Sequence, residues 1–344
     1  MHTSFVFVLR RTLFVCFLLL VCKFSLHGLT AFASDASTKT FPPHLYTTLS
    51  NNRLTVEYRL TALLKSAGSD RERAWLIYRW VTHHFKHDSR IAALIGDPHK
   101  HSLDHLFQSA GGSCAIFANV MHRLLDKAGL EVKTVYGMVK GAGASQFING
   151  MPVNHVWNTV KIDGTWHLLD ATWGAGYVGR DGFHREQSDL FFMVPPQRAV
   201  LSHYDPADQL GYQAKLGVDQ AVFKRFADDA TYLAAVGFDA KSILKRYAGE
   251  HRGELVAIFN PLSASFKVIE APLAARLQKR PIKFRIDSSA YDELMVLQGK
   301  TWSPMRKSGN VHSIELRPVD GELLVMARRA KEHEYEALLA YSVK

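Results

Sequence analysis

Hydrophobic residues recur with the period of an α-helix in two segments of the first half of the chain. In residues 74–85, apolar side chains stand at positions 74, 77, 78, 81 and 85, which is the spacing of one buried helix face. A second amphipathic helix is expected from Ser113 or Cys114 to Ala128, and Gly129 can take the left-handed conformation that ends it. Gly111-Gly112 lets the backbone turn sharply into this second helix.

Beyond Gly129 the apolar period changes from 3.6 to 2. Strands are predicted over residues 132–139, 153–162 and 165–171, and Asp163-Gly164 is a two-residue hairpin turn between the last two. Residues 219–252 have a helical pattern. Short strands are then predicted over residues 255–259, 282–286, 293–297, 313–316 and 322–327. The pattern predicts an α+β fold: N-terminal helices and an antiparallel sheet, followed by a small β-sandwich-like C-terminal domain.

The first 33 residues have the pattern of a secretory signal peptide. Arg10 and Arg11 precede an apolar run over residues 12–21, and Ala31-Phe32-Ala33 is a small-x-small cleavage site. We expect cleavage near Ala33/Ser34 and a periplasmic or extracellular protein without a stable membrane span; an uncleaved anchor is the alternative. The predicted domains are residues 34–215 (catalytic), 216–252 (helical connector) and 253–344 (β-rich).

Charge gives little indication of a partner. The chain has 42 basic and 32 acidic residues, a net charge of +10, but the basic residues are dispersed and no base-reading motif accompanies them. We therefore expect no nucleic-acid partner. The sequence does not indicate the oligomeric state.

Cys114 is the one cysteine that remains after the predicted leader, since Cys16 and Cys22 lie within it. A single cysteine cannot form an internal disulfide, so this thiol is buried and inert, paired with another protein, or kept for its chemistry. A helix N-terminus favours the thiolate, and an imidazole that takes the proton completes the activation.

His155 and Asp170 are the candidate base and its orienting carboxylate. If Asp163-Gly164 is the turn, His155 faces Thr172 and Trp157 faces Asp170, so that all four lie on one face of the hairpin. His155 and Asp170 are then diagonal neighbours within imidazole-to-carboxylate reach. The sequence therefore predicts a catalytic Cys114–His155–Asp170 triad, in place of a core cysteine and structural polar residues.

Other candidates have less support. Gln108, six residues before Cys114, has the spacing of an oxyanion-stabilising glutamine or is a surface residue. Trp157 and Trp173 either wall the site or pack in the core. Histidine clusters at 83–87 and 99–105 have no accompanying cysteine or clear carboxylate set, so no metal site is predicted.

Three motifs resemble the transglutaminase-like cysteine-hydrolase superfamily: Gly-Gly-Ser-Cys-Ala-Ile-Phe-Ala at 111–118, Asn-His-Val-Trp-Asn-Thr-Val at 154–160, and Trp-His-Leu-Leu-Asp-Ala-Thr-Trp-Gly at 166–174. Residues 74–88 are similar to the leading helix of this superfamily, although His87-Asp88 replaces its usual aromatic-Asp ending. Phe191–Pro196 and His203-Tyr204-Asp205-Pro206 resemble the kyphoscoliosis-peptidase branch. The resemblance covers roughly residues 55–215. It implies a papain-like core, a Cys-His-Asp triad and no required cofactor.

The expected function is an exported thiol enzyme that attacks peptide or glutamine-type amides through a thioester intermediate, with protein or peptide as substrate. Hydrolysis by a peptidase or amidase is favoured, because water is the default acceptor. Two alternatives stay open: a catalytically silent envelope binding or scaffold protein with the same fold, and a protein cross-linking acyltransferase.

Overall fold

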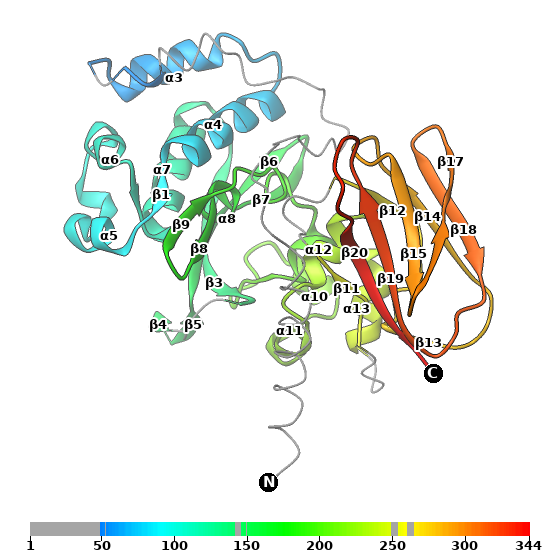
Figure 1. The fold of residues 1–344 in the computed structure, drawn as a ribbon. Coiled ribbons are helices and arrows are strands. Elements are labelled where there is room, and N and C mark those ends of the chain that lie inside the picture. Colours follow the sequence, from blue (N-terminus) through cyan, green and yellow to red (C-terminus); the bar gives the residue numbers. More distant parts are fainter. Residues whose placement is uncertain (1–48, 52, 142–145, 149, 249–253, 260–264) are drawn as a thin grey trace. The chain divides into compact units, whose positions relative to one another are not determined.

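A computed structural model describes residues 49–344, apart from 52, 142–145, 149, 249–253 and 260–264 (Figure 1). The predicted signal peptide therefore lies outside the described residues. The N-terminal part is helical, as predicted. Its helices are α3 (Val56–Leu64), α4 (Asp70–His84), α5 (Ser89–Ile95), the 3₁₀ helix η1 (Pro98–Lys100), α6 (Leu103–Ser109) and α7 (Cys114–Lys127).

Helices α4 and α7 confirm the two amphipathic segments. α7 begins at Cys114, and Gly129 beyond its end has a φ of +79°. Ile77 of α4 and Val120 of α7 are fully buried in one core with Val160 of the sheet. The core thus fixes the N-terminus of α7 against the sheet.

A four-stranded sheet with the order β10-β3-β6-β7 lies beside these helices. Its strands are β3 (Val132–Val139), β6 (His155–Ile162), β7 (Thr165–Leu169) and β10 (His203–Tyr204). β3 pairs antiparallel with β6, and β6 with β7. Ile162 faces Thr165 across the Asp163-Gly164 turn, which confirms the predicted hairpin register.

Short elements complete this half of the fold. β1 (Lys86–His87) pairs in parallel with β2 (Gly111–Gly112), β4 (Gln146–Ile148) with β5 (Met151–Val153), and β8 (Gly176–Gly179) with β9 (Gly182–Arg185). Two short helices are α8 (Ala171–Ala175) and α9 (Pro196–Ala199). The predicted strand 153–162 is therefore divided between β5 and β6, and the predicted strand 165–171 ends two residues early.

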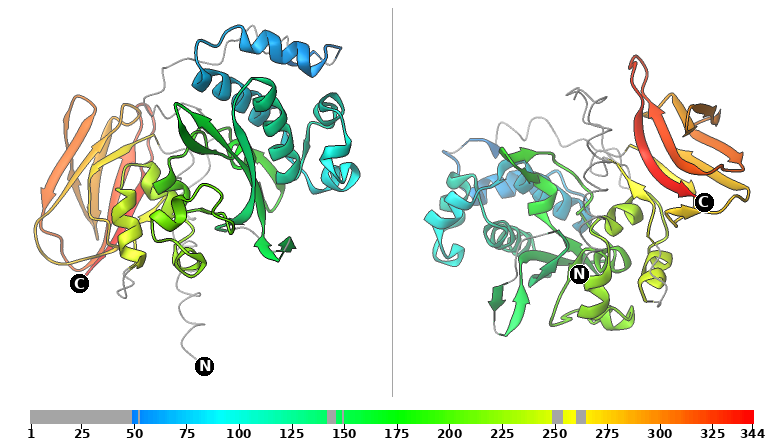
Figure 2. Two further views of the ribbon diagram at one scale, coloured as in Figure 1. Left: turned by 180° about the vertical axis from the view of Figure 1, so that it is seen from behind. Right: turned by 60° about the horizontal axis from the view of Figure 1, so that its bottom comes forward.

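The helical segment after the sheet contains α10 (Tyr212–Lys215), α11 (Gln220–Arg225), α12 (Ala230–Ala235) and α13 (Ala240–Ala248). Two β-sheets follow (Figure 2). One has β11 (Ala257–Ile258), β13 (Arg276–Leu277), β15 (Glu293–Gln298), β16 (Thr301–Pro304), β19 (Gly321–Arg328) and β20 (Glu336–Val343). The other has β12 (Lys267–Glu270), β14 (Ile282–Asp287), β17 (Arg306–Ser308) and β18 (Val311–Leu316).

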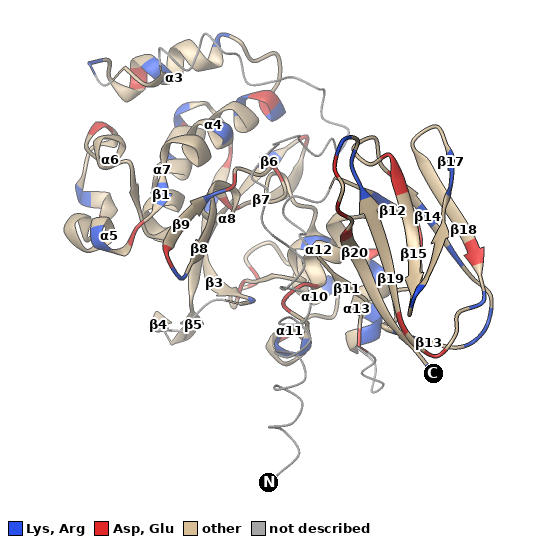
Figure 3. Cartoon of the chain, in the orientation of Figure 1, with Lys and Arg blue, Asp and Glu red and all other residues tan. Residues whose placement is uncertain are grey.

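The two C-terminal sheets share one hydrophobic core, in agreement with the predicted sandwich. The ring of Phe284 on β14 lies 5.6 Å from that of Tyr341 on β20, and both side chains are buried. Lys and Arg are interspersed with Asp and Glu over the fold (Figure 3). No helix among the described residues is both long and apolar enough to cross a lipid bilayer.

Candidate active site

Cys114 is the first residue of α7, and its side chain is partly exposed and not in a disulfide. The preceding Gly112 has a φ of +150° and lies so close to Ile116 that a Cβ would overlap that side chain. Only glycine therefore fits at position 112, where the chain enters α7. The helix leaves its first N–H groups without intrahelical acceptors, so the Cys114 sulfur lies where a negative charge is stabilised.

His155, the first residue of β6, lies between Cys114 and Asp170. Its Nε2 is 2.7 Å from Asp170 Oδ2, and the Cys114 side chain lies close enough to the ring to raise the pKa of His155. Since Nε2 faces the carboxylate, Nδ1 is the nitrogen left for the sulfur. Burial alone would lower the pKa of His155, but the Asp170 carboxylate and, to a smaller extent, Cys114 raise this pKa above its ordinary value.

Asp170 is buried and fully hydrogen-bonded. It is the N-cap of α8: its Oδ1 accepts from the backbone N–H groups of Thr172 (2.9 Å) and Trp173 (3.0 Å). Its Oδ2 accepts from His155 and from His203, at 2.7 and 3.1 Å. Burial would raise the pKa of Asp170, but the two histidines hold this pKa well below its usual range. The carboxylate is thus ionised and fixed on both oxygens.

One detail of the predicted hairpin is wrong. The β6–β7 ladder ends at the pair Asn158–Leu169, so His155 does not face Thr172 and Trp157 does not face Asp170 as strand partners. The chain leaves the strand because the Asp170 side chain caps α8. His155 and Asp170 still meet, because the cap turns the carboxylate toward the start of β6.

His203 is a buried member of the site that sequence reasoning missed. β10 places it on the other edge of β3, opposite Val139. Burial lowers the pKa of His203, so the ring is neutral. Nε2–H then donates to the acceptor-only carboxylate of Asp170, and Nδ1 accepts from the Ser202 hydroxyl at 2.8 Å. The His203-Tyr204-Asp205-Pro206 motif was the available signal, but it did not indicate this contact.

His155, Asp170 and His203 are also the one group among the described residues whose side-chain types and spacing could hold a metal ion. The separations of 2.7 and 3.1 Å between donor nitrogens and the shared oxygen are those of direct hydrogen bonds. Of the other histidines, His101 Nε2 lies 2.9 Å from the Ile95 carbonyl oxygen. This geometry favours a hydrogen-bonded site.

Two tryptophans pack against the imidazoles. The ring of Trp157 is fully buried, with its centroid 6.2 Å from that of His155 and 5.0 Å from that of His203. The ring of Trp173 is partly exposed and lies 5.8 Å from His155 and 4.9 Å from His203. Trp157 therefore supports the histidines from the core, whereas Trp173 reaches the surface beside them.

Gln108 lies on the exposed side of α6, and its side chain makes no hydrogen bond within the described part of the chain. Its role toward an oxyanion stays a prediction. His87, on β1 opposite Gly112, is closer to the chemistry: burial and then the charge of His155 lower the pKa of His87. The sequence singled out His87 as a departure from the family motif and as part of a histidine cluster, and not as a neighbour of His155.

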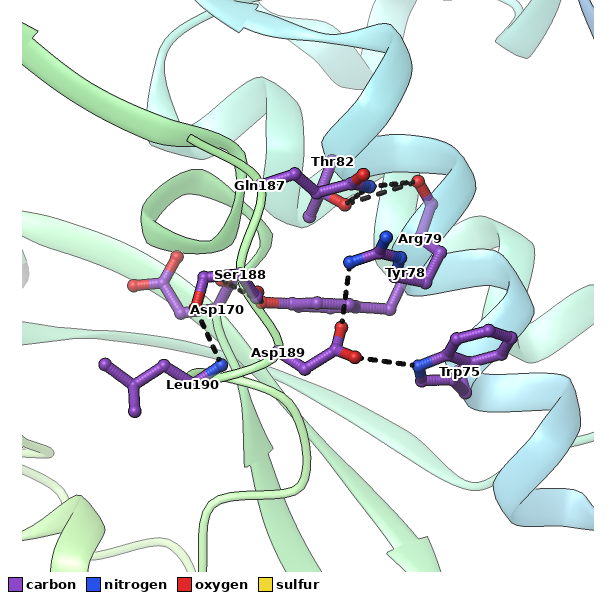
Figure 4. Close-up of polar contacts among 9 residues, drawn as sticks. All are labelled: Trp75, Tyr78, Arg79, Thr82, Asp170, Gln187, Ser188, Asp189 and Leu190. Carbon is purple, nitrogen blue, oxygen red and sulfur yellow. Dashed lines mark hydrogen bonds and ion pairs between the residues drawn. The ribbon is translucent and has the colours of Figure 1, made fainter. Parts of the chain in front are cut away.

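A second set of contacts anchors the backbone around Asp170 to helix α4 (Figure 4). The buried Tyr78 hydroxyl on α4 donates to the carbonyl of Ser188 at 2.9 Å and lies 3.5 Å from that of Asp170. Next to it, Asp189 accepts from the Trp75 indole at 3.2 Å and pairs with Arg79 at 3.4 Å. These contacts fasten the 187–190 segment, and with it Asp170, to α4.

Comparison with known proteins identifies the domain that carries this site. The model of the transglutaminase-like superfamily matches residues 59–171. Kyphoscoliosis peptidase of Mus musculus is 32% identical over 146 residues, which cover 41% of this chain and 22% of the mouse protein. Kyphoscoliosis peptidase of Homo sapiens is 31% identical over 146 residues, which again cover 41% of this chain and 22% of the human protein. The chain thus spans about a fifth of the length of these curated relatives.

A solved crystal structure of a TGase resembles 38% of this chain and 37% of its own length, with 20% identity and a TM-score of 0.25. The family match includes Cys114, His155 and Asp170 but ends before His203. Residues 59–171 therefore form a transglutaminase-like domain, and this part of the chain is similar to the kyphoscoliosis peptidases.

Proposed function

We propose that the chain is a thiol hydrolase that attacks peptide or glutamine-type amides. The observation that carries the proposal is the position of His155, which lies between the Cys114 side chain and a buried Asp170 that it hydrogen-bonds. This arrangement supports a thiolate–imidazolium pair at a helix N-terminus. The transglutaminase-like relationship supports a thiol hydrolase or acyltransferase in general.

In the proposed reaction the Cys114 sulfur forms a bond to the amide carbonyl carbon. The backbone N–H of Cys114 stabilises the oxyanion, since it points out of the first turn of α7. The imidazolium of His155 then gives its proton to the departing nitrogen as the C–N bond breaks, which releases an amine or ammonia and leaves a thioester.

Hydrolysis of the thioester completes the cycle. A water molecule attacks the thioester carbonyl while His155 takes one of its protons, and the C–S bond breaks to release a carboxylic acid and regenerate the thiolate–imidazolium pair. Asp170 keeps the same tautomer and orientation of His155 in both halves. His203 acts through Asp170 and is a positioning residue.

We also propose that the enzyme is exported, on the basis of the leader pattern of residues 1–33. Expression with a C-terminal tag tests this. A periplasmic or secreted product that begins near Ser34 is expected, and a full-length product retained inside the cell contradicts export.

The thiol chemistry is tested by labelling Cys114 with iodoacetamide near neutral pH. Fast labelling that slows to the rate of a free thiol in His155→Ala is expected, whereas His184→Ala, a surface histidine paired with Asp181, should not change the rate. A wild-type rate equal to that of a free thiol would indicate a silent binding protein. Incubation of wild type and Cys114→Ala with envelope extracts then separates ammonia release from new peptide ends.

A further inference from the structure

A cavity of about 460 Å³ opens beside the candidate nucleophile. It begins at Ala115, the residue after Cys114, and follows the outward side of α7 between η1 and β3. Apolar atoms make up most of its lining surface, but polar and charged side chains also reach it, among them Asp97, His99, Asn119, His122, Arg123 and Thr134. A substrate bound at Cys114 could extend into it.

The charge of the cavity favours an anion. Nη1 of the half-buried Arg123 donates to the carbonyl of His101 at 2.8 Å, and no carboxylate of the described residues forms an ion pair with this guanidinium. Asp97 is the one acidic residue of the lining, and it pairs with Lys100 at 3.9 Å. The cavity therefore offers a guanidinium without a counter-charge, and it does not suit the amine of a lysine.

Asn119 gives an independent indication of a ligand. Its side chain is only 5% exposed and lines the cavity, and Nδ2 lies 3.1 Å from His99 Nδ1. Oδ1 has no hydrogen-bond partner within the part of the chain that the structure describes. An unpaired buried acceptor is costly, so a ligand that brings an N–H group into the cavity would be stabilised by it after a small side-chain movement.

We infer that this cavity is a substrate subsite that binds a peptide carboxylate: Arg123 pairs with the carboxylate, and Asn119 Oδ1 accepts from a neighbouring peptide N–H. The inference rests on the proposed function, because it assigns the peptide that Cys114 attacks. Arg123 follows Cys114 by nine residues, or about 14 Å along the helix axis. Extended peptide spans about 3.4 Å per residue, so the carboxylate lies three to four residues from the reacting carbonyl.

The test measures peptide binding to the Cys114→Ala protein, in which no turnover occurs. Acetylated peptides carry a central glutamine in an alanine–serine background, with glutamate or its isostere glutamine three or four residues to either side. A further pair without glutamate ends in a free carboxylate or an amide at the same distance. The two sets distinguish an acidic side chain from a chain terminus as the source of the carboxylate.

We expect one carboxylate peptide to bind about 10-fold more tightly than its neutral counterpart, and the difference to shrink at high salt. Arg123→Gln should abolish the preference, and Arg123→Lys should retain part of it. Arg73→Gln is the matched control, because Arg73 also donates to a backbone carbonyl, that of Ala128, but lies outside the cavity.

Equal affinity for acidic and neutral peptides, or a preference that survives Arg123→Gln in a folded protein, would overturn the subsite. This result is separate from the thiol-labelling test. If labelling of Cys114 depends on His155 but the peptides show no carboxylate preference, the proposed chemistry stands and only the subsite fails.

Discussion

Replacing His203 with phenylalanine tests whether the second histidine positions the candidate triad. Phenylalanine keeps the ring among Trp157 and Trp173 but removes the 3.1 Å hydrogen bond to Asp170 and the 2.8 Å hydrogen bond from the Ser202 hydroxyl. The carboxylate then keeps three of its four hydrogen bonds to these partners. A hydrogen bond to a buried charged group contributes about 1.5–3 kcal/mol and a neutral one about 1 kcal/mol, so we expect a stability loss of about 3 kcal/mol from the two together.

Loss of the hydrogen bond between His203 and Asp170 should also make Cys114 less reactive. Without the His203 donor the pKa of Asp170 rises, and the carboxylate is less firmly held, so it orients the His155 ring toward Cys114 less well. The imidazolium then stabilises the Cys114 thiolate less. If the ion pair between Cys114 and His155 loses the full energy of the Asp170 hydrogen bond, iodoacetamide labelling at neutral pH slows by about 10- to 100-fold. The acid limb of the labelling profile then moves to higher pH.

The measurement is the labelling rate of Cys114 between pH 4 and pH 10, together with thermal unfolding. His312→Phe is the control, because His312 is a fully buried histidine on β18, in a different sheet. It should leave the labelling profile unchanged. If His203→Phe lowers stability but labels with the wild-type rate and pH profile, His203 is a packing residue and the positioning role is refuted.

Further predictions concern the support and the charge of the site. Gly137→Ala should cost about 1–3 kcal/mol in thermal unfolding and slow thiol labelling, because the new Cβ would overlap both the Tyr204 carbonyl oxygen of β10 and the Trp157 ring; unchanged labelling would argue against the support that these two groups give the site. Tyr78→Phe should cost about 1 kcal/mol, measured by urea unfolding, because the hydroxyl donates to a backbone carbonyl; an unchanged midpoint would contradict this. The stability difference between wild type and Asp170→Asn should be largest between about pH 4 and pH 6.5. It should fall at lower pH, because the pKa of Asp170 is depressed in the fold, and at higher pH, because that of His155 is raised; a pH-independent difference would refute the coupling.

The proximity of His155 and Asp170 could be predicted because a two-residue turn fixes which residues of a hairpin share a face. The same reasoning extended the ladder two residues too far. A strand pattern does not show that an aspartate at its end caps a helix, and capping won over continued pairing at Asp170. The error concerned the backbone, whereas the side chains still met.

His203 could not be predicted in the same way. It is 33 residues from Asp170, and its place depends on β10 joining the far edge of β3. No local pattern specifies such a pairing, because a two-residue strand has too few positions for a recognisable period. The C-terminal sandwich shows the same limit: β14, β15, β18 and β19 were foreseen from their apolar runs, whereas β20 was missed although it is central to its sheet.

The edge position of β10 sets the order in which the site can form during synthesis. Cys114, His155 and Asp170 have all been made once residue 170 leaves the ribosome, yet Asp170 still lacks Phe191, whose carbonyl accepts from its backbone N–H, and His203. A fragment that ends at residue 171, where the family match ends, contains the triad without this enclosure. The nascent chain therefore carries the candidate nucleophile Cys114 before it has the groups that hold Asp170, and the hydrogen bond from His203 to Asp170 forms only when β10 is in place on β3.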